Sequence, residues 1–226
     1  IWILLLWLRS ADVSRRPSMA FEWTQVLNSV TIAAAAAAVA ALAAIPIAYF
    51  AATHRSRLAT LFERMTYVGF AVPGIVLALA LVYFGAGYLP WLYQTLPLLV
   101  FAYVVRFLPQ AVGSTRTSFL QVDPKVVEAG RTLGESPLSV FRRITFPLTR
   151  SGIVAGAALV FLTTMKELPV TLVLRPSGFE TIVTQIWRAQ ETALYQYAAV
   201  PALILLGISG LSMVVLLSQE GSNRGL

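Results

Sequence analysis

The sequence predicts an all-α fold, a polytopic bundle of transmembrane helices with five complete spans and the end of a truncated one. Of the 226 residues, 58% are hydrophobic and only 12% are charged, whereas soluble domains carry about 25% charged residues. The apolar residues gather in runs of about 20, the length that crosses a bilayer as a helix. Short loops rich in arginine separate these runs.

Composition excludes several functional classes. The chain has no cysteine, which excludes disulfides, thiolate metal sites and cysteine nucleophiles. Its single histidine, His54, is expected to be a solvated loop residue rather than a metal ligand. The net charge of +7 raises the question of nucleic acid, but the basic residues lie between apolar runs, where membrane topology explains them. We therefore expect membrane lipid and no nucleic acid as a partner, no metal and no catalytic residue.

The first apolar run, Ile1–Leu8, is too short to cross about 30 Å of hydrocarbon. No basic region precedes it, as a signal peptide would require. We expect it to be the end of a span that begins in a longer polypeptide.

Five further apolar runs are predicted to be complete spans. They are Leu27 to about Ala52, Thr66 to about Gly87, Leu96 to about Val112, Leu148 to about Leu168, and Ala198 to about Leu217. The first contains an alanine run at 33–38. Because alanine lets helices approach closely, we expect this span to pack inside the bundle.

The loops predict the orientation of the chain. Loops 54–65 and 114–150 together hold nine basic and four acidic residues, which places them and the C-terminal tail in the cytoplasm. Near the opposite ends of the spans lie the aromatic residues Trp23, Tyr88, Trp91 and Trp187, as is typical of a membrane interface.

The loop 114–150 contains two helix-start patterns. Asp123-Pro124 supplies a capping carboxylate and a proline suited to the first helical position, and Gly134 is a natural helix end. Ser136-Pro137 repeats the start, so a second short helix is expected to about Arg143, before Pro147 opens the next span. The apolar residues of this pair are expected to be exposed unless a partner covers them. They are Val127, Leu133, Leu138, Val140 and Phe141.

Residues 128–147 resemble the EAA signature of binding-protein-dependent ABC importer permeases. That signature reads Glu-Ala-Ala, three residues, Gly, nine residues, Ile, any residue, Leu and Pro. This chain carries the same spacing at Glu128, Ala129, Gly130, Gly134, Ile144 and Pro147. It departs in two places, Gly130 for the second alanine and Phe146 for leucine. Both changes are mild.

The resemblance implies a type I ABC importer permease fold and a mechanism. The helix pair would dock as a coupling helix in a groove of a separate ATPase subunit, with Glu128 as the charged contact, Gly134 as the turn, and Val127, Leu133, Leu138 and Phe141 as apolar contacts. ATP and magnesium would bind to that ATPase dimer, and this chain would hold no cofactor. The alternative is an ordinary solvated helix pair.

The resemblance also implies the remaining partners and the domain division. A periplasmic substrate-binding protein and a second permease half or copy would complete an importer in the bacterial inner membrane. Residues 1–23 would be a truncated span and periplasmic loop, 24–218 the transmembrane domain with coupling helices at 124–147, and 219–226 a cytoplasmic tail. The chain itself lacks the phosphate-binding pattern of an ATPase, since neither of its lysines, Lys125 and Lys166, follows a glycine.

Charged residues within spans are candidates for the translocation path. Arg106 either forms an electropositive wall for an anionic substrate or has a structural role, in which it bonds backbone carbonyls of a broken helix or extends toward the cytoplasm. We favour the structural role. Lys166 and Glu167 form either a local ion pair or a gate. Residues 176–198 are expected to be a re-entrant or amphipathic segment with Ile182, Val183, Ile186 and Trp187 at helical spacing.

The segment from Lys166 to Phe179 resembles the ferric-iron branch of the family, whose chains often carry two tandem halves. Ferric iron is therefore the expected cargo; thiamine, polyamine and sulfate-type solutes are alternatives. An ion-gradient transporter would place acidic or histidine relays within spans, and only Glu167 is a candidate. A membrane enzyme would need a histidine, cysteine or paired-carboxylate constellation, which the sequence does not show.

Overall fold

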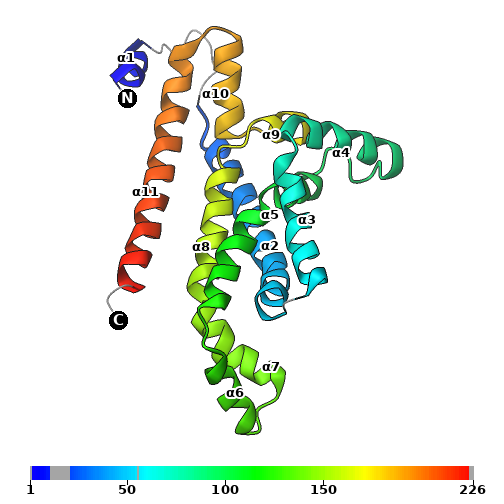
Figure 1. Cartoon of the computed structure of the whole chain (residues 1–226). Helices are drawn as coiled ribbons and strands as arrows, with labels where there is room; N and C mark the ends of the chain where they lie inside the picture. Colours follow the sequence, from blue (N-terminus) through cyan, green and yellow to red (C-terminus); the bar gives the residue numbers. More distant parts are fainter. Residues whose placement is uncertain (1, 11–20, 55, 224–226) are drawn as a thin grey trace. The chain divides into compact units, whose positions relative to one another are not determined.

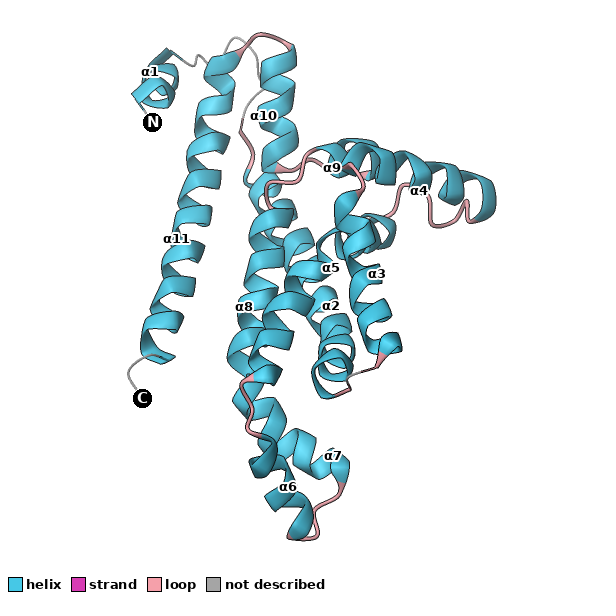
Figure 2. Ribbon diagram, in the orientation of Figure 1, coloured by secondary structure: helices cyan, strands magenta, loops and turns pink. Residues whose placement is uncertain are grey.

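The computed structural model describes residues 2–10, 21–54 and 56–223. In these ranges the chain forms helices and no strand (Figures 1 and 2), which confirms the predicted all-α class. The helices are α1 (Trp2–Ser10), α2 (Trp23–Thr53), α3 (Arg57–Ala71), α4 (Gly74–Tyr88), α5 (Leu96–Leu120), α6 (Pro124–Thr132), α7 (Pro137–Val140), α8 (Phe146–Thr164), α9 (Pro169–Leu174), α10 (Ile182–Glu191) and α11 (Ala199–Asn223). A π-helical turn at Phe141–Thr145 precedes α8, and a 3-10 turn at Tyr195–Ala198 precedes α11.

The described residues divide into two compact units. The first is drawn from 1–36, 73–103 and 161–226, and the second from 37–72 and 104–160. In the first unit α4 packs against α9, and α10 packs against α11. Its core includes Ala33, Met165 and Ile182, which are each at most 2% exposed.

Small residues bring α5 and α8 close together in the second unit. A side chain at Gly152 would lie 1.8 Å from Ser118 Oγ, and one at Gly156 would lie 3.1 Å from Ala111 Cα. The Ser114 hydroxyl donates a hydrogen bond to the Gly152 carbonyl at 2.9 Å. This is the small-residue packing by which membrane helices associate.

One face of α2 is built from alanines four residues apart. Ala36, Ala40, Ala44 and Ala48 are fully buried. Residues at this spacing share a helix face, so the prediction that the alanine-rich span packs inside the protein is confirmed.

Among the residues that the structure describes, three helical stretches are long and apolar enough to cross a membrane: Trp23–Thr53, Leu96–Leu120 and Pro137–Thr164. They correspond to the first, third and fourth predicted spans. The fifth lies in α11, where Tyr195–Leu211 is an apolar helical stretch shorter than a span.

The second predicted span is not one continuous helix. It is broken between α3 and α4, at Val72 and Pro73, and the pair counts as at most one span. Val72 is extended, with φ −75° and ψ 131°, because the ring of the following proline disfavours the helical region. Pro73 also lacks the N–H that a continuing helix would need.

The predicted loops are shorter than expected. Most of loop 54–65 is the start of α3, which Ser56 caps by accepting the Ala59 N–H at 3.1 Å. Helix α5 extends to Leu120, well past the predicted end of the third span near Val112. His54 is exposed as expected and stacks on Phe50 with 4.8 Å between ring centroids. Residues 11–20 of the predicted first segment, and 224–226 of the predicted tail, lie outside the described residues.

Candidate functional site

The helix pair predicted at 124–147 is present in the second unit. We call residues 123–145 the knob; in Figure 1 it is the α6–α7 hairpin below α8. Helix α6 begins at Pro124 with the Asp123 carboxylate accepting the Lys125 N–H at 2.9 Å. These residues confirm the predicted start, in which a carboxylate satisfies an N–H that lacks an intrahelical partner.

Gly134 ends the first helix of the knob. Its φ of +87° lies in the left-handed region that favours glycine. The N–H of Glu135 reaches back to the Gly130 carbonyl at 3.2 Å, which satisfies a carbonyl at the end of α6. The first helix thus ends next to Gly134, as predicted.

The second helix begins as predicted, but it does not end near Arg143. The Ser136 hydroxyl caps α7 by accepting the Ser139 N–H at 3.3 Å. The chain then passes through the π-helical turn directly into α8, so Pro137–Thr164 is one helical stretch. In this turn the Phe146 N–H bonds to the Phe141 carbonyl. This five-residue spacing loosens the helix just before Pro147, whose ring would clash with the preceding turn of a regular α-helix.

The residues of the EAA-like motif divide into exposed and buried positions. Glu128, Ala129, Gly134 and Pro147 are exposed. Gly130 is buried, and a side chain there would lie 2.8 Å from Ile144 Cδ1 and 3.3 Å from Val140 Cγ2. Gly130 and Ile144 therefore hold α6 against the helix that follows it, whereas Glu128 and Ala129 face outward.

The predicted apolar surface of the knob is only partly correct. Leu133 is 85% exposed and Leu138 is 75% exposed. Val127 is half-buried and Val140 is buried, because Val140 lies under Gly130. The knob presents two leucines, one from each side of the Gly134 turn.

Phe141 was expected on the apolar surface of the knob, but it turns inward. Its ring lies 5.4 Å from that of Tyr49 and 6.5 Å from that of Phe119, measured between centroids. Tyr49 belongs to α2 and Phe119 to α5, so Phe141 anchors the knob to the ends of both helices. The Tyr49 pair is edge-to-face, a geometry that adds to the stabilisation from burial alone.

Polar contacts stiffen the second half of the knob. The Ser139 hydroxyl donates to the Glu135 carboxylate, which also accepts from Arg143 at 2.8 Å. The hydroxyl, and then the Arg143 charge, hold the pKa of Glu135 below its usual value. A groove of about 480 Å³ beside these residues is lined by Leu138, Arg142 and Arg143.

Arg106 bonds to the break between α3 and α4. Its guanidinium donates to the Val72 carbonyl at 3.0 Å. Val72 is the extended residue that precedes Pro73, so its carbonyl lies outside any regular helix ladder. This geometry is the structural role that we favoured for Arg106.

The side chains of Lys166 and Glu167 lie in different environments. Lys166 is exposed, whereas the Glu167 carboxylate accepts the Val170 N–H at 3.3 Å and thereby caps α9. Glu167 also lines a small polar cavity of about 10 Å³ with Tyr103 and Thr171, whose hydroxyl oxygens lie 2.6 Å apart. Glu167 therefore contributes to the start of α9, and the choice between an ion pair and a gate stays a prediction.

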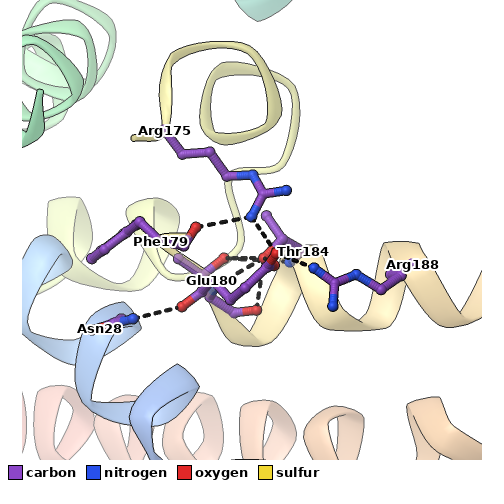
Figure 3. A network of polar contacts seen from close by, with 7 residues as sticks. Asn28, Arg175, Phe179, Glu180, Thr184 and Arg188 are labelled. Carbon is purple, nitrogen blue, oxygen red and sulfur yellow. Dashed lines mark hydrogen bonds and ion pairs between the residues drawn. The ribbon is translucent and has the colours of Figure 1, made fainter. Parts of the chain in front are cut away.

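Sequence reasoning missed a network centred on Glu180, between α9 and α10 (Figure 3). The Glu180 carboxylate pairs with Arg175 at 2.6 Å, and it also contacts Arg188 and the Thr184 hydroxyl. Asn28 of α2 donates to the Glu180 backbone carbonyl at 2.9 Å. The only signal in the sequence is a glutamate that lies between two arginines.

Helix α10 lies in the segment predicted to be re-entrant or amphipathic. Thr181 and Thr184 form a reciprocal capping box at its start. Of the residues predicted at helical spacing, Ile182 is fully buried and Val183 and Ile186 are half-buried, but Trp187 is exposed. Among the described residues, no group of three or more histidine, aspartate or glutamate side chains is arranged to hold a metal ion.

Comparison with known proteins identifies the family. Residues 44–220 match the model of the binding-protein-dependent transport system inner membrane component. The chain is 36% identical over 189 residues to the Fe(3+)-transport system permease protein of Haemophilus influenzae, covering 84% of this chain but 37% of that relative. It is 29% identical over 206 residues to a probable molybdenum ABC transporter permease of Haloferax volcanii, covering 76% of that protein.

Solved structures agree with this fold. An inward-facing structure of the MetNI methionine ABC transporter contains a chain with a TM-score of 0.69 at 13% identity, and the match covers 90% of this chain and 98% of that one. A bacterial alginate ABC transporter, in complex with its pentasaccharide-bound periplasmic protein, gives a TM-score of 0.58 at 13% identity, covering 88% and 78% of the two chains. This chain, with its apolar helices and its match over most of its length, is a multi-pass membrane protein that belongs to the family of binding-protein-dependent transport system inner membrane components.

Proposed function

We propose that the chain is a permease subunit of an ATP-binding-cassette importer in the bacterial inner membrane. It forms part of the translocation path, and a separate ATPase dimer supplies the energy. A periplasmic substrate-binding protein and a second permease half or copy complete the assembly. The chain itself is not an enzyme, and ATP and magnesium bind to the partner. Residues 24–218 form its transmembrane domain.

The observation that carries this proposal is the rigid, capped knob with two leucines at its tip. Leu133 and Leu138 are 85% and 75% exposed, although the rest of the knob is held by caps, the Gly130–Ile144 contact and the Phe141 cluster. The hairpin therefore holds two apolar side chains in fixed, exposed positions. Exposed apolar residues on an ordered element are typical of a surface that binds another protein. Glu128 and Ala129 lie exposed on the same element, where they contact the ATPase.

The same knob explains how a docking event reaches the membrane. The second helix of the knob continues into α8 without a break, and Phe141 contacts α2 and α5. A movement of the knob therefore moves the ends of three helices together. Coupling of this kind needs a stiff connection, and the Glu135–Ser139–Arg143 contacts supply part of it.

The test is to change the knob without changing the fold. Glu128→Lys reverses the exposed charge, and Gly134→Asp places a side chain in the left-handed turn. Both variants are expected to insert in the membrane at normal levels but to lose co-purification of the ATPase and ATP-driven uptake by about tenfold or more. The control is Glu191→Lys, an exposed charge reversal at the end of α10, which should leave co-purification unchanged.

Two results would contradict the proposal. Normal ATP-driven uptake in both knob variants would show that the knob does not couple. Uptake driven by an ion gradient, with no ATPase required, would indicate a secondary transporter.

For the cargo we propose ferric iron. The relative with 36% identity is named as a Fe(3+) permease, although others are named for molybdenum and polyamines. The assembled importer with its binding protein should take up radioactive ferric iron, and a tenfold excess of molybdate should not compete. Uptake of molybdate without iron would reject this cargo and leave the importer proposal intact.

A further inference from the structure

The groove of about 480 Å³ on the knob holds apolar and cationic side chains together. Its lining includes Leu138, Arg142 and Arg143, with Ser136 and Ser139 beside them. Leu138 and Arg142 are four residues apart in one helical stretch, and positions at this spacing share a helix face. A partner group that enters the groove therefore meets the exposed leucine and the arginine at once.

The hydrogen-bonding groups that remain open in this groove are mainly donors. The Ser136 hydroxyl accepts the Ser139 N–H, and the Ser139 hydroxyl donates to the Glu135 carboxylate. Arg143 donates to the same carboxylate at 2.8 Å, so its charge is compensated. Arg142 is exposed, and among the residues that the structure describes no carboxylate pairs with it. Because a guanidinium has five N–H donors and no acceptor, the groove offers donors and an uncompensated positive charge.

This charge limits which partner group can dock on the knob. A protein surface that covers Leu138 also removes water from Arg142, because both line the same groove. Burial of a cation without a counter-charge is costly, whereas a carboxylate can accept two parallel hydrogen bonds from a guanidinium. A neutral acceptor would satisfy the hydrogen bonds but not the charge. A stable interface therefore needs an acidic group next to its apolar contact.

We propose that this groove binds the side chain of an aspartate or glutamate of the ATPase subunit, which pairs with Arg142 while the surrounding ATPase surface covers Leu138. The inference rests on the docking of the knob proposed above, and it names the chemistry of the partner surface. A free anion would satisfy Arg142 but leave Leu138 in water. Since salt screens the attraction between charges, the affinity for the ATPase should fall as the salt concentration rises.

The experiment titrates the purified full chain with the purified ATPase in detergent, at about 0.05 M and about 0.5 M salt, between which screening increases severalfold. Arg142→Gln removes the charge and should weaken binding at low salt by about tenfold or more, as expected when one member of a buried charge pair is lost. It should also make binding less dependent on salt. Arg142→Lys, which keeps the charge, should restore most of that dependence.

Arg150→Gln is the matched control, because Arg150 is an exposed arginine of α8 that does not line the groove. It removes the same charge from the chain and should change the affinity by less than about twofold, as is usual for an exposed charge. Substitutions of single aspartates and glutamates of the ATPase by lysine then identify the partner group. One of them should restore the binding of the Arg142→Glu variant and weaken the binding of the unchanged chain.

Three results would overturn the inference. If Arg142→Gln behaves like Arg150→Gln while Leu138→Ser loses binding, the knob docks without an acidic group in the groove. If no lysine substitution on the ATPase restores binding of Arg142→Glu, Arg142 has no paired carboxylate there. Binding of inorganic phosphate to the chain alone, lost in Arg142→Gln without any change in ATPase affinity, would assign the groove to a free anion. Failure of the docking proposal itself looks different, because neither Leu138→Ser nor Arg142→Gln would then change the affinity for the ATPase.

Discussion

The knob and the α9–α10 segment are built from similar parts and differ in what they leave exposed. Each joins two short helices through a glycine with positive φ, +87° at Gly134 and +80° at Gly178. Each also begins a helix with a hydroxyl cap, at Ser136 and Thr181. The knob leaves two leucines exposed, however, whereas α10 buries Ile182 and even the polar Gln185 completely.

Ion pairs show the same contrast. In the α9–α10 segment, Glu180 joins Arg175, Arg188 and Thr184 from both sides of the turn, and Asn28 ties it to α2. In the knob, Glu135 bonds only within its own hairpin, to Ser139 and Arg143. The polar contacts of Glu180 thus reach another helix of its unit, whereas those of Glu135 stay within the knob, which the ring of Phe141 ties to α2 and α5. Exposure therefore distinguishes the proposed docking surface from a structural turn when the local motifs are the same.

The largest expected effect on stability comes from the buried segment. Ile182→Ala removes a fully buried side chain and should lower the free energy of unfolding by about 2–5 kcal/mol. Leu138→Ala in the knob, the matched apolar truncation, should change it by less than about 0.5 kcal/mol. Thermal unfolding in detergent measures both. If both variants lost the same free energy of unfolding, the two segments would not differ in how much their apolar side chains contribute to stability.

The next effect is on partner binding. Leu133→Ser and Leu138→Ser should each weaken ATPase binding by about tenfold, since truncation of a central apolar contact typically costs more than about 1 kcal/mol. Leu120→Ser is the control, because Leu120 is 55% exposed at the end of α5 outside the knob. Binding can be measured by titrating the purified ATPase. If all three variants behave alike, the effect is not specific to the knob.

A smaller effect on stability is expected from substitutions at the two glycines with positive φ, where only the backbone conformation and no side-chain contact is changed. Gly134→Ala and Gly178→Ala each force a side chain into the left-handed region, at a cost of about 1 kcal/mol. Neither glycine has an atom close enough to meet the added methyl group, so the cost is conformational. Faster amide exchange should be confined to the turn that carries the substitution. Exchange that spreads through the whole unit would show that the turn supports more than its own hairpin.

The smallest effect is a pH dependence within the knob. The pKa of Glu135 is lowered from its ordinary 4.5 by the Ser139 hydroxyl and by Arg143. Its contribution to stability is therefore complete above that ordinary value and is lost as the pH falls through the lower folded-state value. The carboxyl carbon shift in an NMR titration should show this, and Ser139→Ala should move the midpoint upward. An unshifted midpoint would mean that the hydroxyl does not stabilise the carboxylate.

Local rules predicted the knob better than they predicted its packing. Asp123, Gly134 and Ser136 act through hydrogen bonds to their own neighbours, so their roles can be inferred from sequence. The inward turn of Phe141 could not, because it depends on Tyr49 and Phe119, which are distant in the chain. The π-helical turn was missed for a related reason: Pro147 was taken as a helix start, although a loosened turn accommodates it within a helix.

The broken second span and the Glu180 network show the same limit. Pro73 lies inside the second predicted span, but hydropathy is averaged over a window that includes it and therefore predicts one span. Whether Arg106 would bond to the freed carbonyl depended on how α5 packs beside α3. The three charges of the Glu180 network are 5 and 8 residues apart, and only the folded turn brings them together.

The five-residue spacing of the turn at Phe141–Thr145 lets one extra residue enter the helix without changing the direction of its two ends. A regular α turn closes with one residue fewer. Removing a single residue there would therefore leave Leu138 on nearly the same side of α8, but the ring of Pro147 would then meet the preceding turn. Such a deletion should weaken the join between the tip and the span, although it leaves hydropathy and charge almost unchanged.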